Sequence, residues 1–429
     1  MKTLFAAIVI VSLVSGASAR VFNVLDYGAK TDGTTLDTTP IQKALDECGE
    51  SGGGTVEFPA GVYLSQPIVL RGETTFKLDS GATLLAVTNQ SDFMKTPGDW
   101  LKARSSGDFV PFITGKHLKN ITFTGRGTID GNGYVWWGEA EKARQRVPGY
   151  SLPRPNLLIL QQCKNVVIEN VTLQNSPKSQ FVPDECEGVV VSNVTILAPE
   201  HAANTDGIDP SDSRNVLITR CHIDTGDDDI AIKSGHKAPD HEFACENISV
   251  SDCLFLHGHG MSIGSETYGG VRNVTVTNCV FNGTENGLRI KSQRGKGGLV
   301  ENIVFEDIHM TNVDPALTFT CYYMANSAKD PVQKAPPESD AAQAMTEKTP
   351  IFRDIYIKNV TANCPRDAGI IMGLPESGIS NVVFENVNIL AATGMKIENA
   401  KGIQFKNSKV RPDEDKPFIV KNAEVENQN

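Results

Sequence analysis

The chain has 429 residues, and its 51 acidic residues outnumber its 40 basic ones, so that the formal net charge is −11. This charge argues against a nucleic-acid-binding protein, because phosphates attract basic surfaces. Hydrophobic residues make up 40% and charged residues 21% of the chain, which excludes a disordered protein and indicates a globular one.

The first nineteen residues have the features of a secretory signal peptide. Lys2 precedes an apolar run from Leu4 to Val14, and Ala17-Ser18-Ala19 form a small-residue cleavage site before Arg20. The apolar run is shorter than the roughly 20 residues that a membrane-spanning helix needs. We therefore expect cleavage near Ala19 and secretion, to the extracellular space or the periplasm, of a protein without a membrane anchor.

A short helix is predicted near the start of the mature chain. Pro40 suits the first turn of a helix, and Ile41, Ala44, Leu45 and Cys48 then follow at the spacing of one apolar helix face. We expect this helix to cover the N-terminal end of a stack of strands, where unpaired strand edges would otherwise invite aggregation.

A short pattern that alternates apolar and polar residues recurs along the chain, as in Asn-Val-Val-Ile at Asn165. Such alternation is typical of strands with one buried face. The segments start at positions 120, 165, 188, 215, 247, 273, 302, 354, 381 and 402. A strand that cannot bury its face alone must stack on copies of itself. The repeat therefore predicts an all-β fold, a single-stranded right-handed parallel β-helix (solenoid), in which residues 20–429 form a single domain.

Two columns of residues recur at fixed places in these repeats. The apolar column, six residues after each start, consists of Val171, Val194, Cys221, Cys253, Cys279, Ile308, Val360 and Val387. We interpret its three cysteines as reduced thiols of the core rather than as half-cystines. The position before it holds Asn or Asp in almost every repeat, with Arg220 as the exception. Asn and Asp tolerate left-handed backbone and can hydrogen-bond along the stack.

Three segments break the spacing of the repeat, at 88–111, 132–155 and 326–350, and are expected to project from the coils as loops. The second loop contains Trp136 and Trp137, which would either stack on a sugar or pack against the protein. Its basic residues would either contact a uronate or stay solvated; they are Lys142, Arg144, Arg146 and Arg154.

Four polar clusters interrupt the apolar pattern on successive repeats: Asn204-Thr205-Asp206-Gly207, Gly226-Asp227-Asp228-Asp229, Gly258-His259-Gly260 and Arg289-Ile290-Lys291. Matching the next inward apolar residue of each coil places Asp206, Asp228 and His259 in one column. The same alignment places Lys233 and Lys291 in another. Neighbouring strands lie about 4.8 Å apart. We therefore expect the carboxyl groups of Asp206, Asp227 and Asp228 to crowd together and to raise the pKa of one of them.

A protonated carboxyl beside an ionised one is what glycoside hydrolysis requires, because one group protonates the leaving oxygen and the other activates water. Arg289 and Lys291 point the same way from one strand and are suited to bind a carboxylate of a sugar acid. Calcium is the alternative ligand of clustered carboxylates. It is disfavoured because His259 and two cations flank the acids, so no metal and no cofactor are expected.

At these four clusters the chain resembles the polygalacturonases of glycoside hydrolase family 28, pectin-degrading right-handed β-helix enzymes that carry N-T-D, G-D-D, G-H-G and R-I-K motifs in this order. The resemblance implies that Asp227 is the general acid and that Asp206 and Asp228 hold and activate the water. It also implies that His259 supports the acid.

The resemblance further implies that Arg289 and Lys291 bind the galacturonate carboxylate. We expect Asn204 and Lys233 to be further substrate-binding residues. A tyrosine about thirty residues beyond R-I-K contacts the substrate in this family, and Tyr322 is preferred here over its neighbour Tyr323. Asp229 stands where many members carry cysteine, so the disulfide of those members is not implied.

The expected function is hydrolysis of α-1,4-galacturonosyl linkages in polygalacturonan or pectin by an inverting single displacement. Exo action is favoured because the chain resembles compact bacterial members of the family. The alternatives are a rhamnogalacturonan or xylogalacturonan hydrolase, a calcium-dependent pectate lyase, and a β-helix that binds polysaccharide without cleaving it. The expected partner is a pectic polysaccharide or oligogalacturonide, which the local cations must attract against the net negative charge.

Overall fold

The structure is a computed structural model that describes residues 20–98, 100–147, 151–236, 244–323, 340–413 and 416–428. The expected signal peptide, residues 1–19, lies outside the described residues, and so do residues 326–339 of the third expected loop. Among the helices of these described stretches, none is long and apolar enough to cross a membrane.

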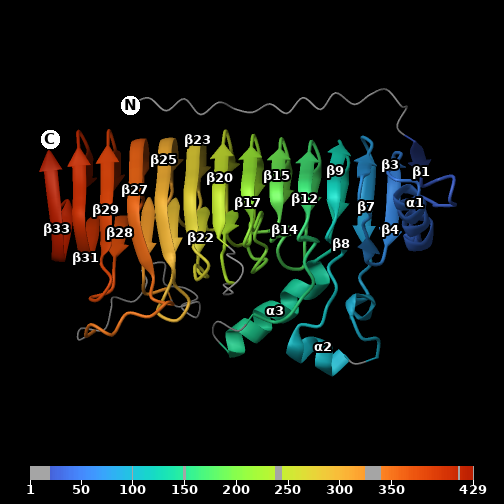
Figure 1. The fold of residues 1–429 in the computed structure, drawn as a ribbon, viewed down its shortest axis with the longest axis horizontal. Coiled ribbons are helices and arrows are strands. Elements are labelled where there is room, and N and C mark those ends of the chain that lie inside the picture. The colour runs from blue at the N-terminus through green and yellow to red at the C-terminus, as the bar shows by residue number, and fades with distance from the viewer. Residues whose placement is uncertain are drawn as a thin grey trace.

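Parallel strands lie side by side along one axis in three columns, which we call the first, second and third (Figure 1). The first column is formed by β1 (Val21–Asn23), β3 (Gly54–Phe58), β6 (Thr74–Leu78), β9 (Lys119–Gly125), β12 (Lys164–Glu169), β15 (Glu187–Ser192), β17 (Arg214–Thr219), β20 (Cys245–Ser251), β23 (Val271–Asn282), β25 (Leu299–Thr311), β27 (Ile351–Asn363), β29 (Ile379–Glu385), β31 (Thr393–Lys406) and β33 (Phe418–Gln428).

The second column takes the C-terminal halves of β23, β25 and β27 together with β2 (Asp32–Leu36), β4 (Gly61–Ser65), β7 (Ala82–Ala86), β10 (Thr128–Asp130), β13 (Thr172–Gln174), β16 (Thr195–Leu197), β18 (His222–Asp224), β21 (Leu254–Phe255), β30 (Asn388–Ala391) and β32 (Lys409–Pro412).

The third column takes the N-terminal halves of β31 and β33 together with β5 (Ile68–Val69), β8 (Ile113–Lys116), β11 (Leu158–Gln161), β14 (Phe181–Asp184), β19 (Ile230–Ile232), β22 (Met261–Gly264), β24 (Leu288–Lys291), β26 (Leu317–Thr320) and β28 (Asp367–Met372). Single β-bridges at Ile208 and Ser211 join β14 to the residues of β19 and to Lys233. The third column is therefore continuous from β14 to β19.

All ten segments that the sequence repeat identified lie in strands of the first column, from β9 to β31. The pairing keeps the expected register, since Val189 pairs with Val216 and Ile248 with Val274. Parallel connections between strands of one sheet follow a right-handed path. The prediction of a parallel β-helix with a short N-terminal helix is therefore confirmed.

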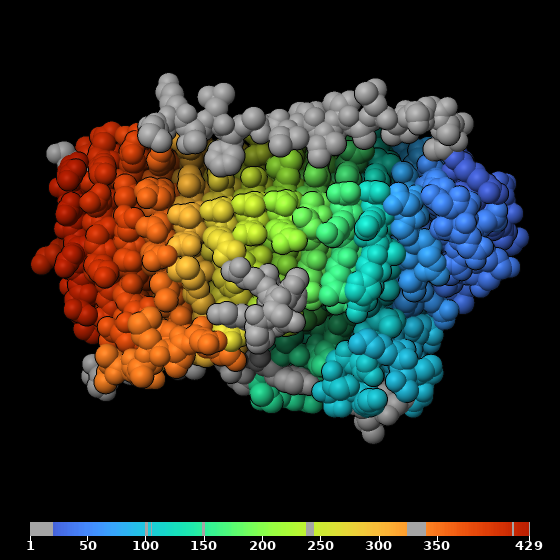
Figure 2. Space-filling view, viewed as in Figure 1, coloured from blue at the N-terminus to red at the C-terminus, as the bar shows by residue number. Residues whose placement is uncertain are grey.

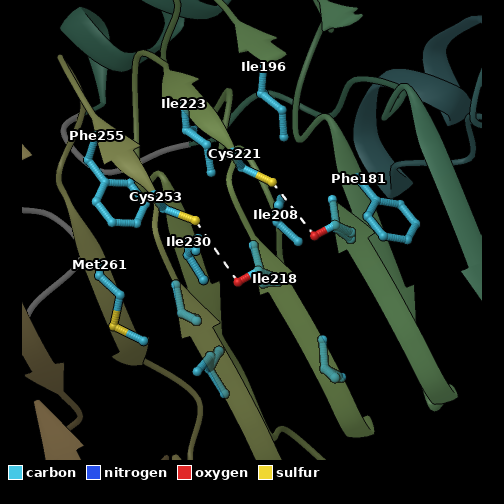
Figure 3. Packing of buried hydrophobic residues seen from close by; sticks show 14 of the residues in the cluster. Phe181, Ile196, Ile208, Ile218, Cys221, Ile223, Ile230, Cys253, Phe255 and Met261 are labelled. Carbon is cyan, nitrogen blue, oxygen red and sulfur yellow. Dashed lines mark hydrogen bonds between the residues drawn. The ribbon is translucent and has the colours of Figure 1, made fainter. Parts of the chain in front are cut away.

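The interior is a stack of apolar side chains from all three columns (Figure 3). Cys221, Cys253 and Cys279 are at most 2% exposed and continue the column of Val171 and Val194, as predicted. All nine cysteines are free and buried. In Figure 3 the thiols of Cys221 and Cys253 point to backbone carbonyl oxygens of the neighbouring coil, at 3.7 and 4.0 Å. The thiols thus behave as small core side chains.

The polar column predicted beside these residues forms an amide ladder at the turn after the first column. Its members adopt positive φ, for example 60° at Asn170 and 54° at Asn193. The side-chain amide of Asn193 donates to the side-chain oxygen of Asn170 at 2.8 Å, and that of Asn278 donates to Asp252 at 2.6 Å. Asn and Asp recur here because they tolerate the left-handed turn and also bond to the next coil.

The helix α1 (Thr38–Glu50) begins two residues before Pro40, the residue expected in its first turn. Its predicted apolar face is buried, with Ile41, Ala44, Leu45 and Cys48 all at 0% exposure. The helix packs against β1, β3 and β5 at the N-terminal end of the stack (Figure 1). It thereby covers apolar side chains of the first coil that would otherwise face water.

Two of the expected loops are partly helical. The segment 88–111 contains the 3-10 helix η1 (Gln90–Phe93) and α2 (Trp100–Ser106), and the segment 132–155 contains α3 (Tyr134–Arg146). In Figure 2 the segments 88–111 and 340–350 protrude from the same edge of the stack. This is the edge at which the third column lies (Figure 1).

The tryptophans of α3 pack against the protein, so their alternative role in sugar stacking is not supported. Trp136 is 1% exposed and makes edge-on contacts with the rings of Phe93 and Phe109, at centroid distances of 5.9 and 5.3 Å. Trp137 is 8% exposed, and its indole N–H donates to the carbonyl oxygen of Ser176 at 3.0 Å. Trp136 therefore anchors α3 to the neighbouring projection 88–111, and Trp137 anchors it to the stack.

Phe281→Ala tests the stacked core. Phe281 is 0% exposed, and its ring lies 4.6 Å from that of Phe255 on the next coil. We expect the substitution to lower the free energy of unfolding by about 3–5 kcal/mol, because it removes buried contacts and leaves a cavity. Chemical denaturation measures this loss. Val280→Ala is the matched control, because Val280 is adjacent and 41% exposed; equal small losses in both variants would contradict the core assignment.

Candidate active site

The polar clusters meet where strands of the third column begin. Asp227 and Asp228 precede β19, His259 precedes β22, and Arg289 and Lys291 lie on β24. Ile208 pairs with Ile230, Ile230 with Met261 and Met261 with Leu288. The register predicted from the sequence is therefore confirmed, and it places the four clusters on four adjacent coils.

Asp227 is held from two sides. The backbone N–H and the side-chain amide of Asn204 both donate to its Oδ2, at 3.2 and 3.3 Å. His259 Nδ1 lies 3.1 Å from its Oδ1. Asn204 is itself oriented, because its side-chain oxygen accepts hydrogen bonds from Arg154 at 2.8 Å and from Ser151 at 3.1 Å. Asn204, which was expected to bind substrate, thus positions Asp227.

Asp228 is 2% exposed and receives three donors. Its Oδ1 accepts from Ser262 at 2.8 Å and from Arg289 at 3.3 Å, and its Oδ2 accepts from Lys291 at 2.6 Å. Burial would raise the pKa of Asp228, but the charges of Lys291 and Arg289 lower it below its ordinary value. The Arg289–Lys291 pair, expected to bind substrate, therefore also keeps Asp228 ionised.

Asp206 shares Lys233 with a carboxylate that is absent from the predicted set, Asp209. Lys233 Nζ lies 2.9 Å from a carboxylate oxygen of each. Burial raises the pKa of Asp206 although Lys233 opposes it, and burial with the charge of Asp206 raises the pKa of Asp209 to about 7. Lys233 thus bridges two buried carboxyl groups.

The raised pKa expected among the crowded carboxyls falls on Asp206 and Asp209 rather than on Asp227. Burial alone would also raise the pKa of Asp227, but the charges of His259 and Lys291 lower it well below the ordinary value. The sequence showed which carboxyls are close together. It did not show which cation each of them contacts.

His259 joins Asp227 to a second residue that sequence reasoning missed, Glu285. His259 Nε2 lies 3.1 Å from the carboxylate of Glu285, while Nδ1 faces Asp227. Burial alone would lower the pKa of His259, but Asp227, Glu285 and Asp228 raise it well above its ordinary value. The imidazole is therefore a cation between two carboxylates. Extending the register from Leu288 back to Glu285 would have aligned it with Gly258 and Asp227.

The two glycines that flank His259 are required by the backbone. Gly258 and Gly260 adopt φ of +83° and +71°, which L side chains rarely adopt. A Cβ on Gly260 would lie 2.1 Å from the carbonyl oxygen of Asn286 on the next coil. The G-H-G cluster is therefore a tight turn that presents one imidazole to the carboxylates.

The structure places Tyr323, and not the preferred Tyr322, beside the cationic pair. The ring of Tyr323 lies 5.4 Å from the Arg289 guanidinium and 5.0 Å from Lys291 Nζ. Tyr322 turns the other way and donates to Asp340 at 2.6 Å. Adjacent residues point to opposite sides of an extended chain. Which of them faces the site depends on a register that the sequence does not display.

Asp229 is fully buried, and Thr225 donates to one of its carboxylate oxygens at 3.0 Å. Its other oxygen has no hydrogen-bond partner among the described residues. Burial raises the pKa of Asp229 well above its ordinary value, so this carboxyl is neutral. Its hydrogen bond with Thr225 spans the turn that carries Asp227 and Asp228.

One arrangement in the site resembles a metal-binding group. One donor atom each of Asp227, Asp228 and His259 lie within 4.8 Å of one another. However, Lys291 and Arg289 contact the same Asp228 carboxylate, and His259 is held as a cation by three carboxylates. A divalent ion would have to displace these positive charges, so the donor set does not fit calcium.

Comparison with known proteins places this geometry in context. The family model of the glycosyl hydrolases family 28 matches residues 48–411. An endo-polygalacturonase of Pectobacterium carotovorum subsp. carotovorum is 34% identical over 382 residues, which cover 86% of this chain and 88% of the relative.

Solved structures of both cleavage types are also similar. An exopolygalacturonase from Thermotoga maritima matches with a TM-score of 0.73 and 27% identity, over 94% of this chain and 92% of the other. A polygalacturonase from Erwinia carotovora ssp. carotovora matches with a TM-score of 0.71 and 29% identity, over 96% and 98%.

Glu285→Gln tests the charge of His259. The substitution removes one of the carboxylates that raise the pKa of His259, so we expect that pKa to fall and the imidazole to lose its proton at lower pH. NMR titration of the histidine ring measures it. His236, which bonds Asp212 at 2.6 Å on another coil, is the internal control and should not move. An unchanged His259 titration would contradict the role of Glu285.

Proposed function

Because the chain belongs to the glycosyl hydrolases of family 28, we propose that it hydrolyses α-1,4-galacturonosyl linkages of polygalacturonan or pectin. Family membership makes the protein a glycoside hydrolase. The observation that carries the choice of substrate is the joint placement of three carboxyl groups with two cations, Arg289 and Lys291. A sugar acid offers both a glycosidic bond for the carboxyls and a carboxylate for the cations.

We assign Asp227 as the general acid. It lies within hydrogen-bond distance of His259, a cation that can return a proton to it. Asp228 and Asp206 would hold and activate the water, Asp228 as the ionised base that Arg289 and Lys291 stabilise. Attack by that water on the face opposite the leaving oxygen would invert the anomeric configuration in one displacement.

The charge balance of the site also favours a uronate. The pKa of Asp227 is low because His259 and Lys291 are positive. A substrate carboxylate that pairs with Lys291 and Arg289 would bring a negative charge beside Asp227 and offset part of this effect. The pKa of Asp227 would then rise toward the range in which it can donate a proton. A neutral sugar would lack this effect.

We further propose that residues 1–19 are a signal peptide and that residues 20–429 form one secreted catalytic domain. The basic and apolar start of the chain and its Ala17-Ser18-Ala19 site support export. The three strand columns run from β1 to β33 as one stack, which supports a single domain.

We propose exo action. Relatives of both cleavage types match, so the mode depends on the walls of the cleft. The segment after α3 reaches the site directly, because Ser151 and Arg154 bond the Asn204 side chain that orients Asp227. A wall at this place would limit the number of sugar residues that fit between the cleaved bond and the N-terminal coils of the protein.

Asp227→Asn tests the assignment of the acid. Asparagine has the shape of aspartate but cannot donate the carboxyl proton, so we expect kcat to fall by at least about 100-fold. Affinity for oligogalacturonide and the thermal unfolding midpoint should stay near those of the wild type. Release of reducing ends and calorimetric binding measure the two effects. Turnover at the wild-type rate would refute this role for Asp227.

Digestion of polygalacturonate with a chelator present tests both the reaction and its mode. We expect reducing ends to appear without the ultraviolet absorbance of an unsaturated product, because no step requires a metal or eliminates a proton. Monogalacturonate should be the product from the first minutes. Calcium-dependent unsaturated product would instead show a lyase, and an early ladder of oligomers would show endo action. Activity confined to rhamnogalacturonan or xylogalacturonan would overturn the proposed substrate.

A further inference from the structure

A rigid turn, residues 176–179, borders the site one coil before Asp206. The hydroxyl of Ser176 donates to the carbonyl oxygen of Ser179 at 2.9 Å and accepts from the backbone N–H of Lys178 at 3.3 Å. Trp137 donates to the Ser176 carbonyl, and Asn156 accepts from the Ser179 backbone at 3.1 Å. The turn is therefore fixed on both sides by side chains of neighbouring segments.

This turn is also tied to the residue that orients Asp227. One nitrogen of Arg154, Nη1, donates to the carbonyl oxygens of Pro177 and Ala203, at 3.0 and 2.9 Å. The other terminal nitrogen donates to Asn204 at 2.8 Å. A residue on the turn is thus held in a fixed position relative to the catalytic carboxyls.

Lys178 is the cation that this turn presents. In the part of the chain that the structure describes, its amine makes no ion pair and no hydrogen bond, and its side chain is half-buried. Phe181 pairs with Ile208, and Ile208 pairs with Ile230. Extending this register places Lys178 one coil before Thr205 and two coils, about 10 Å, before Asp227.

The charges of the site act on Lys178. Burial lowers the pKa of its amine, the charge of Asp206 raises it, and Lys233 and Arg154 lower it. Its amine is therefore partly desolvated near two carboxyl groups that Lys233 already neutralises. Holding an unpaired, half-desolvated cation in place is unfavourable unless an anion completes the site.

We propose that Lys178 binds a galacturonate carboxylate. This carboxylate belongs to the sugar residue that lies toward the N-terminal coils of the protein from the cleaved bond. The inference rests on the proposed function. Lys233 is occupied by Asp206 and Asp209, while Arg289 and Lys291, which also contact Asp228, are already assigned to the carboxylate of another sugar residue. Lys178 is placed to contact a second carboxylate of the same substrate, on the opposite side of Asp227 from Arg289.

Calorimetric binding of trigalacturonate and of its methyl ester tests this assignment. All variants carry Asp227→Asn, so that the ligand is not cleaved. We expect Lys178→Met to weaken trigalacturonate binding by about tenfold, because a charge-assisted contact is lost. Binding of the methyl ester should not change. Lys178→Arg should restore most of the loss, and Lys401→Met, at an exposed lysine on the distant strand β31, should leave both affinities unchanged.

The outcomes separate this proposal from the proposed function. If the Asp227→Asn parent does not bind trigalacturonate, the proposed substrate is wrong and the role of Lys178 is wrong with it. If the parent binds and Lys178→Met binds equally well, the role of Lys178 alone is wrong. Equal losses for the acid and the ester would also overturn it, because they would show that Lys178 acts through Asp206 rather than on the carboxylate.

Discussion

The in-register hydrogen bonding of parallel coils is the constraint on which the rest of the structure depends. Each strand pairs with the equivalent strand of the next coil, so residues a whole coil apart in the sequence become neighbours about 4.8 Å apart. The amide ladder, the column of core thiols and the adjacent carboxyls of Asp206 and Asp228 all follow from this rule. A catalytic site can therefore be assembled from short clusters, each on its own coil.

The same stacking brings charges together that would repel one another, and the site resolves this by pairing each carboxylate with a cation. Asp228 contacts Lys291 and Arg289, Asp206 contacts Lys233, and Asp227 contacts His259. In a partly buried site such contacts decide which carboxyl is ionised. These contacts gather four cations, Lys233, His259, Arg289 and Lys291, in one cleft of a protein whose net charge is −11. This contrast explains how an acidic protein could bind an acidic polysaccharide.

Much of the fold could be predicted because aligning the sequence repeats shows which residues pair on neighbouring coils. The spacing of the Asn-Val-x-Ile segments predicted the strands of the first column, and aligning Ile208 with Ile230 predicted the order of the candidate site residues. The projections were harder to predict, because they do not repeat. Their helices and the burial of Trp136 depend on contacts with Phe93 and Phe109 from another segment.

Periodicity was enough to predict the parallel stack, the four polar clusters and the coils that carry them, because these features depend only on the repeat. The tertiary structure decided three things that periodicity cannot show. It placed Tyr323 rather than Tyr322 beside Arg289, added Glu285 to His259, and lowered the pKa of Asp227 while raising that of Asp206. Each of these depends on side-chain direction and on the distance between charges, and both are set only when the coils pack together.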